Sequence, residues 1–126
     1  MNAVLDASAA LAWLRDEPGA EQVDAALNGG VISTVNASEA AQKLIQHGAD
    51  GSRAVTQLLG LGLTLTPFTG DDALAAAELW PHTRTHGLSL ADRACLALAQ
   101  RLQRPVLTSD QAWKHLELDL ELQMIR

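Results

Sequence analysis

The sequence predicts an α/β protein with a central, mostly parallel five-stranded sheet and helices on both of its faces. Short apolar runs alternate along the chain with segments of helical periodicity, as they do where helices cross over between parallel strands. Several of these runs are apolar throughout, which is typical of strands buried on both faces. With 126 residues the chain suits one domain with a substantial core, so we expect residues 1–126 to form a single domain.

Five short segments are predicted as strands. The first, Ala3–Leu5, runs directly into Asp6, and a later run at residues 105–107 is followed by hydroxyl side chains and Asp110. The segment Leu118–Leu122 alternates apolar and acidic residues with a period of two, which predicts a closing strand at an edge of the sheet. The remaining two strands are expected at residues 31–34 and 63–66.

Helices are predicted between these strands from apolar residues at i, i+3 and i+4 spacing and from capping residues. Asn36 and Ser38 are candidate caps for the helix that begins near Val35, and Pro81 is expected to kink or end another helix. The helices are expected at residues 9–14, 20–28, 35–48, 52–59, 71–79 and 90–99, with a short one at 113–116.

Charge and cysteine content restrict the class of protein. Nine Lys and Arg residues against 15 Asp and Glu residues give a net charge of −6, which argues against a protein that coats nucleic acid non-specifically. The same balance suits a carboxylate cluster that binds cations, or a basic protein partner. The single cysteine, Cys95, excludes an internal disulfide and is expected to be a small core residue. Neither a secretion signal nor a long apolar span is evident, so we expect a cytoplasmic protein without membrane association.

Four acidic residues fall at corresponding places in the predicted fold. Asp6 ends one strand and Asp110 follows another, while Glu39 and Asp92 lie in the first turns of two helices. Each has an ordinary structural explanation, since an acid can cap a helix or interact with the helix dipole. All four together at the carboxyl edge of the sheet, where α/β proteins place their chemistry, indicate a functional site.

A pocket of carboxylates requires a compensating cation. Two like charges about 4 Å apart repel by about 4 kcal/mol at an effective dielectric constant of 20. Ligation by oxygen alone favours Mg²⁺, with Mn²⁺ as an alternative, over zinc. Such an ion lowers the pKa of a bound water and stabilises charge that develops on a phosphoryl oxygen.

The sequence resembles the PIN domains, and in particular the VapC-type ribonuclease toxins of prokaryotic toxin–antitoxin pairs. The resemblance extends over the whole chain and rests on Val4–Ser8, Glu39, Leu88–Asp92 and Leu107–Trp113, in this order and at this spacing. It implies a PIN-like three-layer α/β/α sandwich, a divalent metal and endonucleolytic cleavage of RNA that arrests translation. It also implies a cognate antitoxin and a homodimer.

The resemblance assigns roles to individual residues. It implies that four acids form the catalytic, metal-binding pocket and that three hydroxyl side chains orient carboxylates or waters. The acids are Asp6, Glu39, Asp92 and Asp110, and the hydroxyl residues are Thr108, Ser8 and Ser109. Gln111 departs from the basic residue found in many relatives. Which basic residues contact RNA stays open among Arg15, Arg84, Arg93 and Arg101.

Two other classes of protein share features with this sequence. A receiver-like domain or an aspartyl phosphatase also has a parallel sheet with Asp at a strand end. The phosphatase usually repeats the acid two residues later, where this chain has Ser8, and a receiver would have a Lys late in the sheet. The other class is a PIN-like fold that binds a partner without catalysis. The presence of all four acids argues against it.

Overall fold

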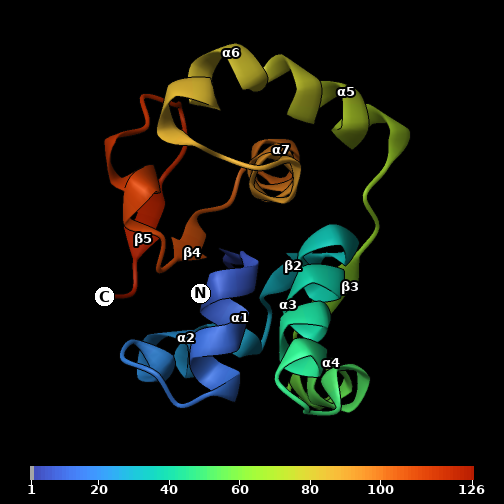
Figure 1. Cartoon of the computed structure of the whole chain (residues 1–126). Coiled ribbons are helices and arrows are strands. Elements are labelled where there is room, and N and C mark those ends of the chain that lie inside the picture. The colour runs from blue at the N-terminus through green and yellow to red at the C-terminus, as the bar shows by residue number, and fades with distance from the viewer. Residues whose placement is uncertain (1) are drawn as a thin grey trace.

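A computed structural model describes residues 2–126 and contains a five-stranded sheet whose paired strands are all parallel. The strand order is β3-β2-β1-β4-β5, so β1 lies in the centre (Figure 1). The predicted fold class is therefore confirmed. The strands are β1 (Val4–Leu5), β2 (Val31–Ser33), β3 (Thr64–Thr66), β4 (Val106–Thr108) and β5 (Leu122–Met124).

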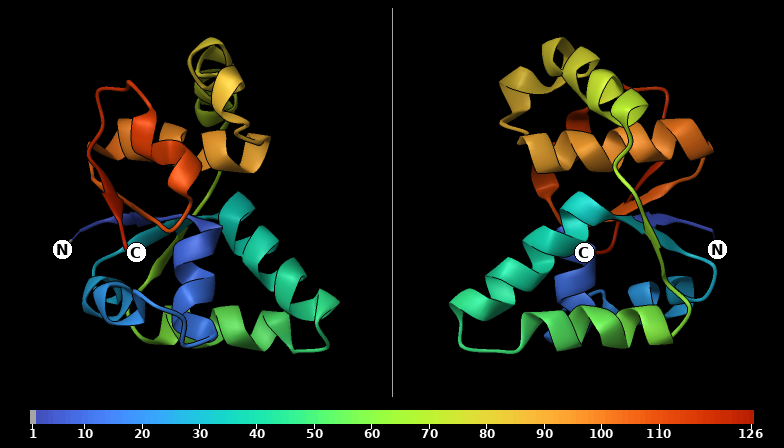
Figure 2. Two further views of the ribbon diagram at one scale, coloured as in Figure 1. Left: turned by 60° about the vertical axis from the view of Figure 1, so that its left-hand side comes forward. Right: turned by 90° about the vertical axis from the view of Figure 1, so that its right-hand side faces the viewer.

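Helices cover both faces of the sheet. One layer contains α1 to α4 and the other contains α5 to α7, which lie on opposite sides of the strands in Figures 1 and 2. The α-helices are α1 (Ala7–Leu14), α2 (Ala20–Leu27), α3 (Thr34–Gln46), α4 (Gly51–Gly60), α5 (Gly70–Glu78), α6 (Trp80–Thr83) and α7 (Leu90–Leu102). The 3₁₀ helices are η1 (Arg84–His86) and η2 (Gln111–His115). Among the helices described in residues 2–126, none has both the length and the apolar character needed to cross a bilayer.

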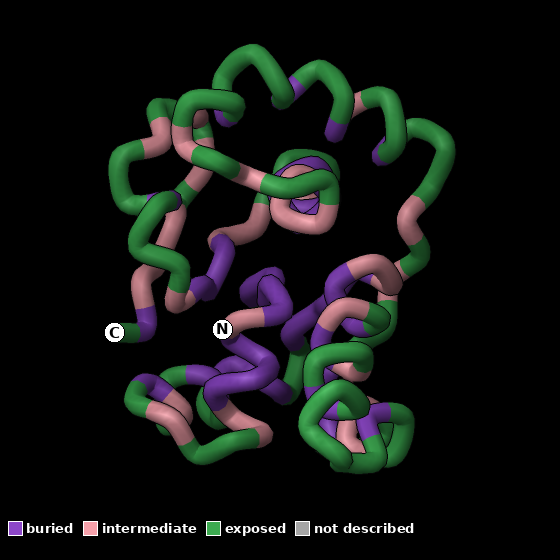
Figure 3. The backbone as a smooth tube through the Cα atoms, viewed as in Figure 1, coloured by how far each residue is buried: buried purple, intermediate pink, exposed green. Residues whose placement is uncertain are grey.

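The central strands are buried on both faces because successive side chains point to opposite sides. Leu5, Ile32 and Leu107 pack into the core beneath α1 to α4, while their neighbours Val4, Val31 and Val106 pack against α5 and α7. Figure 3 shows this buried centre and the exposed outer faces of the helices. Cys95 of α7 is fully buried in the core between the sheet and α5 and α7, as predicted.

The closing strand differs from its predicted position. The alternation predicts it at Leu118–Leu122, whereas β5 begins only at Leu122 and continues to Met124. Leu118 and Leu120 of the alternating segment pack against the core ahead of the strand and form no ladder. Pairing starts with Val106, which lies opposite Leu122 and donates its N–H to the Glu121 carbonyl at 2.9 Å. The alternation of apolar residues therefore reflects their packing against the core. The prediction that the closing strand lies at an edge of the sheet is confirmed.

The start of α3 also differs from the prediction. Its N-cap is Ser33, whose hydroxyl accepts a hydrogen bond from the Val35 N–H at 3.2 Å, and neither Asn36 nor Ser38 caps the helix. Pro81 lies in the first turn of α6, where its missing N–H leaves no helical bond unmade.

The strand order fixes where functional side chains gather. Since β2, β1 and β4 are parallel neighbours, the segments that leave their carboxyl ends emerge at the same edge of the sheet. β1 connects onward to β2 on one side and has β4 on the other, which makes this edge a topological switch point.

Candidate active site

Asp6 lies at the carboxyl end of β1 and is the N-cap of α1. Its Oδ1 accepts hydrogen bonds from the Ala9 N–H at 2.8 Å and from the Ser8 hydroxyl at 2.7 Å, and its Oδ2 accepts one from the Thr108 hydroxyl at 2.6 Å. The residue is only 3% exposed. Burial raises the pKa of Asp6 to about 6 although all three hydrogen bonds lower it, and the negative charge of Asp92 raises it further. Asp6 is therefore both a cap and an unusually basic carboxylate.

Hydroxyl groups connect the ends of β1 and β4. The Ser8 and Thr108 oxygens lie 3.3 Å apart, and each contacts a different oxygen of Asp6. The Ser109 backbone N–H donates to Ser8 Oγ at 2.9 Å, so this residue participates through its main chain. The Asp110 N–H donates to Thr108 Oγ1 at 3.0 Å, which ties Asp110 to the same network. Thr108 and Ser8 thus hold Asp6 and position the start of the segment that carries Asp110.

Asp110 and Asp92 both cap helices. Asp110 is exposed, and its Oδ1 accepts from the Ala112 N–H at 3.0 Å at the start of η2. Asp92 is the third residue of α7 and forms a capping box with Ser89, in which Asp92 Oδ2 accepts from the Ser89 N–H at 2.9 Å. Burial, followed by the charge of Asp110, raises the pKa of Asp92 against the effect of the Ser89 bonds.

Glu39 lies in the second turn of α3 and is partly exposed. Its carboxylate is 4.0 Å from Lys43 Nζ, a contact at the limit of an ion pair. Burial raises the pKa of Glu39, as does the charge of Asp92, whereas the charge of Lys43 and the nearby Asn36 amide lower it.

The negative charges of the four predicted site residues therefore affect the pKa values of their neighbours. Asp92 is the common neighbour, because its charge raises the pKa values of Asp6 and Glu39, and Asp110 acts on Asp92. Among residues 2–126, no three acidic, His or Cys side chains lie close enough to one point to ligate a single ion. The four acids thus lie at one edge of the sheet, but their carboxylates do not converge on a single ion-binding point.

The donor set nevertheless suits a hard divalent cation. It consists of carboxylate oxygens alone, which are the ligands that Mg²⁺ prefers. Burial and mutual repulsion raise three of the four pKa values, so the carboxylates lack sufficient compensating positive charge. Asp6 and Asp92 are the best candidates to hold such an ion, with Glu39 and Asp110 beside them.

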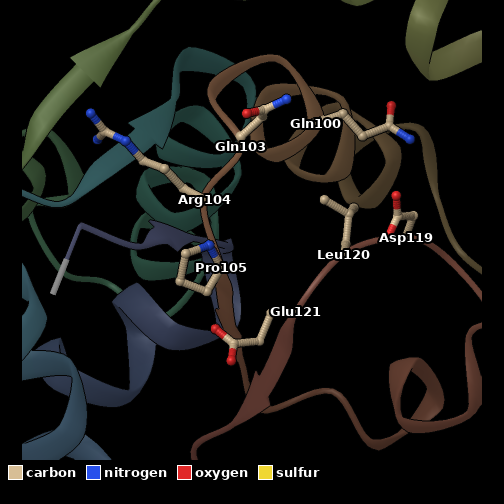
Figure 4. Close-up of a pocket in the computed structure, with 7 residues that line it drawn as sticks. All are labelled: Gln100, Gln103, Arg104, Pro105, Asp119, Leu120 and Glu121. Atoms are coloured by element: carbon tan, nitrogen blue, oxygen red, sulfur yellow. The ribbon is translucent and has the colours of Figure 1, made fainter.

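A hollow of about 500 Å³ adjoins the acids between α3 and the start of α7. Glu39 lines it, together with Ser38, Gln42 and Ala91 among others. A hollow of about 600 Å³ lies at the opposite edge of the sheet, ahead of β4 and β5 (Figure 4). Gln100 of α7 and Gln103, the C-cap of this helix, line the hollow together with Asp119 and Glu121, and none of the four predicted acids lines it.

The candidate phosphate-binding arginines lie in different settings. Arg101 donates to both carboxylate oxygens of Asp72, near the far end of α7 from Asp92. Arg93 Nη1 donates to the Ala76 carbonyl of α5 at 2.9 Å. Arg84 stacks over Trp80 with 5.0 Å between the guanidinium carbon and the ring centre.

Asn36 is a buried residue beside the predicted acids, and it does not have the capping role that the sequence suggests. It is fully buried and donates from Nδ2 to the carbonyl of Ala91, the residue before Asp92, at 2.9 Å. Its place in the third position of a helix makes a cap the obvious expectation, and nothing in the sequence reveals a partner 55 residues away.

Comparisons with known proteins agree with this architecture. A family model described as the PIN domain matches residues 3–118. No curated protein sequence matches the chain.

Solved structures share the fold at low sequence identity. A toxin–antitoxin complex from Klebsiella pneumoniae has a chain that is 16% identical, with a TM-score of 0.77 and coverage of 99% of this chain and 98% of that one. VapBC2 from Rickettsia felis, bound to a promoter DNA fragment, is 16% identical with a TM-score of 0.70 and 98% coverage of both chains. A sarcin–ricin loop cleaving toxin from Mycobacterium tuberculosis is 15% identical with a TM-score of 0.70, covering 90% of this chain and 93% of that one.

Proposed function

The chain belongs to the PIN domain family, and from this premise we propose that it is a Mg²⁺-dependent endoribonuclease, the toxin of a type II toxin–antitoxin pair that acts in the cytoplasm. PIN-domain proteins of this kind are generally nucleases that use divalent metals. The observation that carries the proposal is the electrostatic coupling of Asp6, Glu39, Asp92 and Asp110 at one edge of the sheet. We take residues 1–126 as one catalytic domain.

The proposed roles follow from the contacts. Asp6 and Asp92 hold the cation, and Glu39 and Asp110 complete the site directly or through water. A bound Mg²⁺ would supply the positive charge that lets a phosphate approach the carboxylates and that lowers the pKa of an attacking water. Mn²⁺ is expected to substitute for it.

The hydroxyl network keeps Asp6 ready to bind the cation. Thr108 and Ser8 fix both of its oxygens, and their hydrogen bonds favour the ionised form against the effect of burial. With a pKa of about 6, Asp6 is mostly ionised at pH 7, so it meets a cation as a carboxylate. Ser109 contributes its N–H to hold Ser8 in place.

The alternatives are less compatible with the site. An aspartyl phosphatase needs a second acid two residues after the first, and here Ser8 hydrogen-bonds Asp6 instead. Family membership also separates the chain from receiver domains. A PIN fold that binds a partner without catalysis is the alternative that the cleavage test below distinguishes.

The test is cleavage of total cellular RNA by the purified protein. We expect cleavage with Mg²⁺, leaving 5′-phosphate and 3′-hydroxyl ends, and none in excess EDTA. Asp92→Asn keeps the shape of the side chain and removes its charge, so it should abolish cleavage while the protein stays folded. Asp71→Asn, a change at an exposed acid in α5, is the matched control and should cleave as the wild type does. Full activity of wild type in EDTA would contradict the proposal.

The proposed partners are RNA, a cognate antitoxin and a second copy of the chain. The first helix leaves little apolar surface for such a dimer, because Leu11 is buried and Trp13 and Leu14 pack partly against the core. Exposed apolar side chains lie instead on other helices, including Leu74 and Trp80. A monomeric mass by light scattering at micromolar concentration would refute the dimer.

A further inference from the structure

Asn36 stands out because it is a fully buried polar side chain between two helices that carry candidate ligands. From the third position of α3 it donates its Nδ2 to Ala91 O of α7 at 2.9 Å. Asp92 follows Ala91 directly, and Glu39 lies one turn after Asn36 on α3. Asn36 is thus the direct polar link between the element that carries Glu39 and the one that carries Asp92.

A comparison within the protein indicates that this contact is not a by-product of helix capping. The third residues of α5 and α7, Asp72 and Asp92, both reach back to their N-cap residues in complete capping boxes. The third residue of α3 is Asn36, and its hydrogen bond to Ala91 crosses to another helix 55 residues later. The side chain therefore stabilises the relation between two helices and not the end of its own.

The orientation of the amide is determined by its neighbours. Ala91 O can only accept a hydrogen bond, so the Nδ2 of Asn36 must face α7. Oδ1 is then buried and has no partner among the described residues. An apolar side chain at this position would avoid the unpaired oxygen. A buried amide whose hydrogen bond crosses to the residue before Asp92 points to a role in holding the two helices together.

We propose that Asn36 is a positioning residue of the metal site, which sets the placement of Glu39 against Asp92 by tying α3 to the first turn of α7. The proposal rests on the function proposed above. Asn36 does not touch the substrate or the ion; it acts through the two acids. Groups of this kind, which orient ligands, typically change metal affinity by about 10–100-fold when removed.

The experiment measures Mg²⁺ binding by calorimetry in the absence of RNA, together with thermal unfolding. Asn36→Ala should weaken Mg²⁺ binding about tenfold or more. Thr83→Ala is the matched control, because Thr83 is equally buried and donates to the backbone carbonyl of Leu79, the N-cap of α6, at 3.0 Å. Both changes should lower the melting temperature, but only the first should alter Mg²⁺ affinity.

Kinetics separate positioning from a general loss of structure. For Asn36→Ala we expect kcat to return toward the wild-type value at saturating Mg²⁺, with the KM for RNA unchanged. A loss of kcat that metal does not restore would contradict the proposal, as would wild-type Mg²⁺ affinity in a folded Asn36→Ala protein. If wild type itself neither binds Mg²⁺ nor cleaves RNA, the proposed function fails instead.

The wild-type protein offers a second test if Asn36→Ala does not fold. The side-chain amide protons of Asn36 should exchange slowly with solvent and shift in the NMR spectrum when Mg²⁺ is added. The side-chain amide protons of Asn28, which is exposed, should exchange rapidly and should not shift when Mg²⁺ is added. An Asn36 amide that is indifferent to Mg²⁺, in a protein that binds the ion, would overturn the inference.

Discussion

Replacing Asp6 by Asn should make the metal-free protein progressively more stable relative to wild type as pH rises. The folded-state pKa of Asp6 is about 6, raised by burial from its ordinary value of 3.8. Between these pH values the unfolded chain loses the proton while the folded protein keeps it, so ionisation progressively favours unfolding as pH rises. This destabilisation is nearly absent well below pH 4 and complete above pH 6.

The magnitude follows from the shift. A difference of roughly 2 pKa units corresponds to about 3 kcal/mol at 1.36 kcal/mol per unit. The Asp6→Asn protein has one carboxylate oxygen fewer to accept from the Ser8 and Thr108 hydroxyls, but that loss does not vary with pH. The stability of Asp6→Asn relative to wild type should therefore rise by about 2–3 kcal/mol between pH 4 and pH 7, or roughly 10 °C in melting temperature for a domain of this size.

The assay is urea and thermal unfolding of both proteins in EDTA across this pH range. Asp119→Asn, which removes one charge from an exposed residue, is the control and should show a difference that is nearly constant with pH. A constant difference for Asp6→Asn as well would refute the argument that Asp6 is buried with an elevated pKa.

Other consequences concern the rest of the site and its surroundings. Thr108→Val removes a hydrogen bond that lowers the pKa of Asp6, so the Asp6 carboxyl should titrate at higher pH in carbon-detected NMR, with a stability loss of about 1–3 kcal/mol. Arg101→Ala leaves the buried Asp72 without its partner and should lower the unfolding free energy by about 1–3 kcal/mol. RNA cleavage should not change, because Arg101 lies nine positions after Asp92 along α7, a rise of about 14 Å. If an arginine of the antitoxin occupies the acidic pocket, calorimetry should show that the antitoxin binds more weakly as the Mg²⁺ concentration rises. Its binding to Asp92→Asn should be weaker by about 2–5 kcal/mol. An antitoxin affinity that changes with neither variable would mean that the antitoxin binds elsewhere.

Much of the fold was accessible from sequence because its signals are local. The apolar runs at Val4 and Val106 are buried on both faces, and such runs predict parallel strands without knowledge of their neighbours. The resemblance to PIN domains is confirmed by the match over residues 3–118. The alternation in Leu118–Leu122 misled because packing against a core produces the same period as a ladder.

The site was accessible in part for a different reason. That Asp6 and Asp110 follow parallel strands was enough to place them at one edge, since strand direction fixes that edge. Their caps, and the bonds of Ser8 and Thr108 to Asp6, depend on side-chain geometry that spacing does not encode. The contact of Asn36 with Ala91 is still less visible, because it joins residues far apart in the chain.

The central claim is that the carboxylates at this edge bind the divalent ion that the chemistry needs. Anomalous diffraction from crystals soaked in Mn²⁺ tests this most directly, since Mn²⁺ replaces Mg²⁺ at oxygen ligands and can be located by its own signal. The account predicts a peak within ligating distance of Asp6 and Asp92, about 2.0–2.2 Å from their oxygens, which is lost in Asp92→Asn. A peak elsewhere in the protein, or none at saturating Mn²⁺, would contradict it.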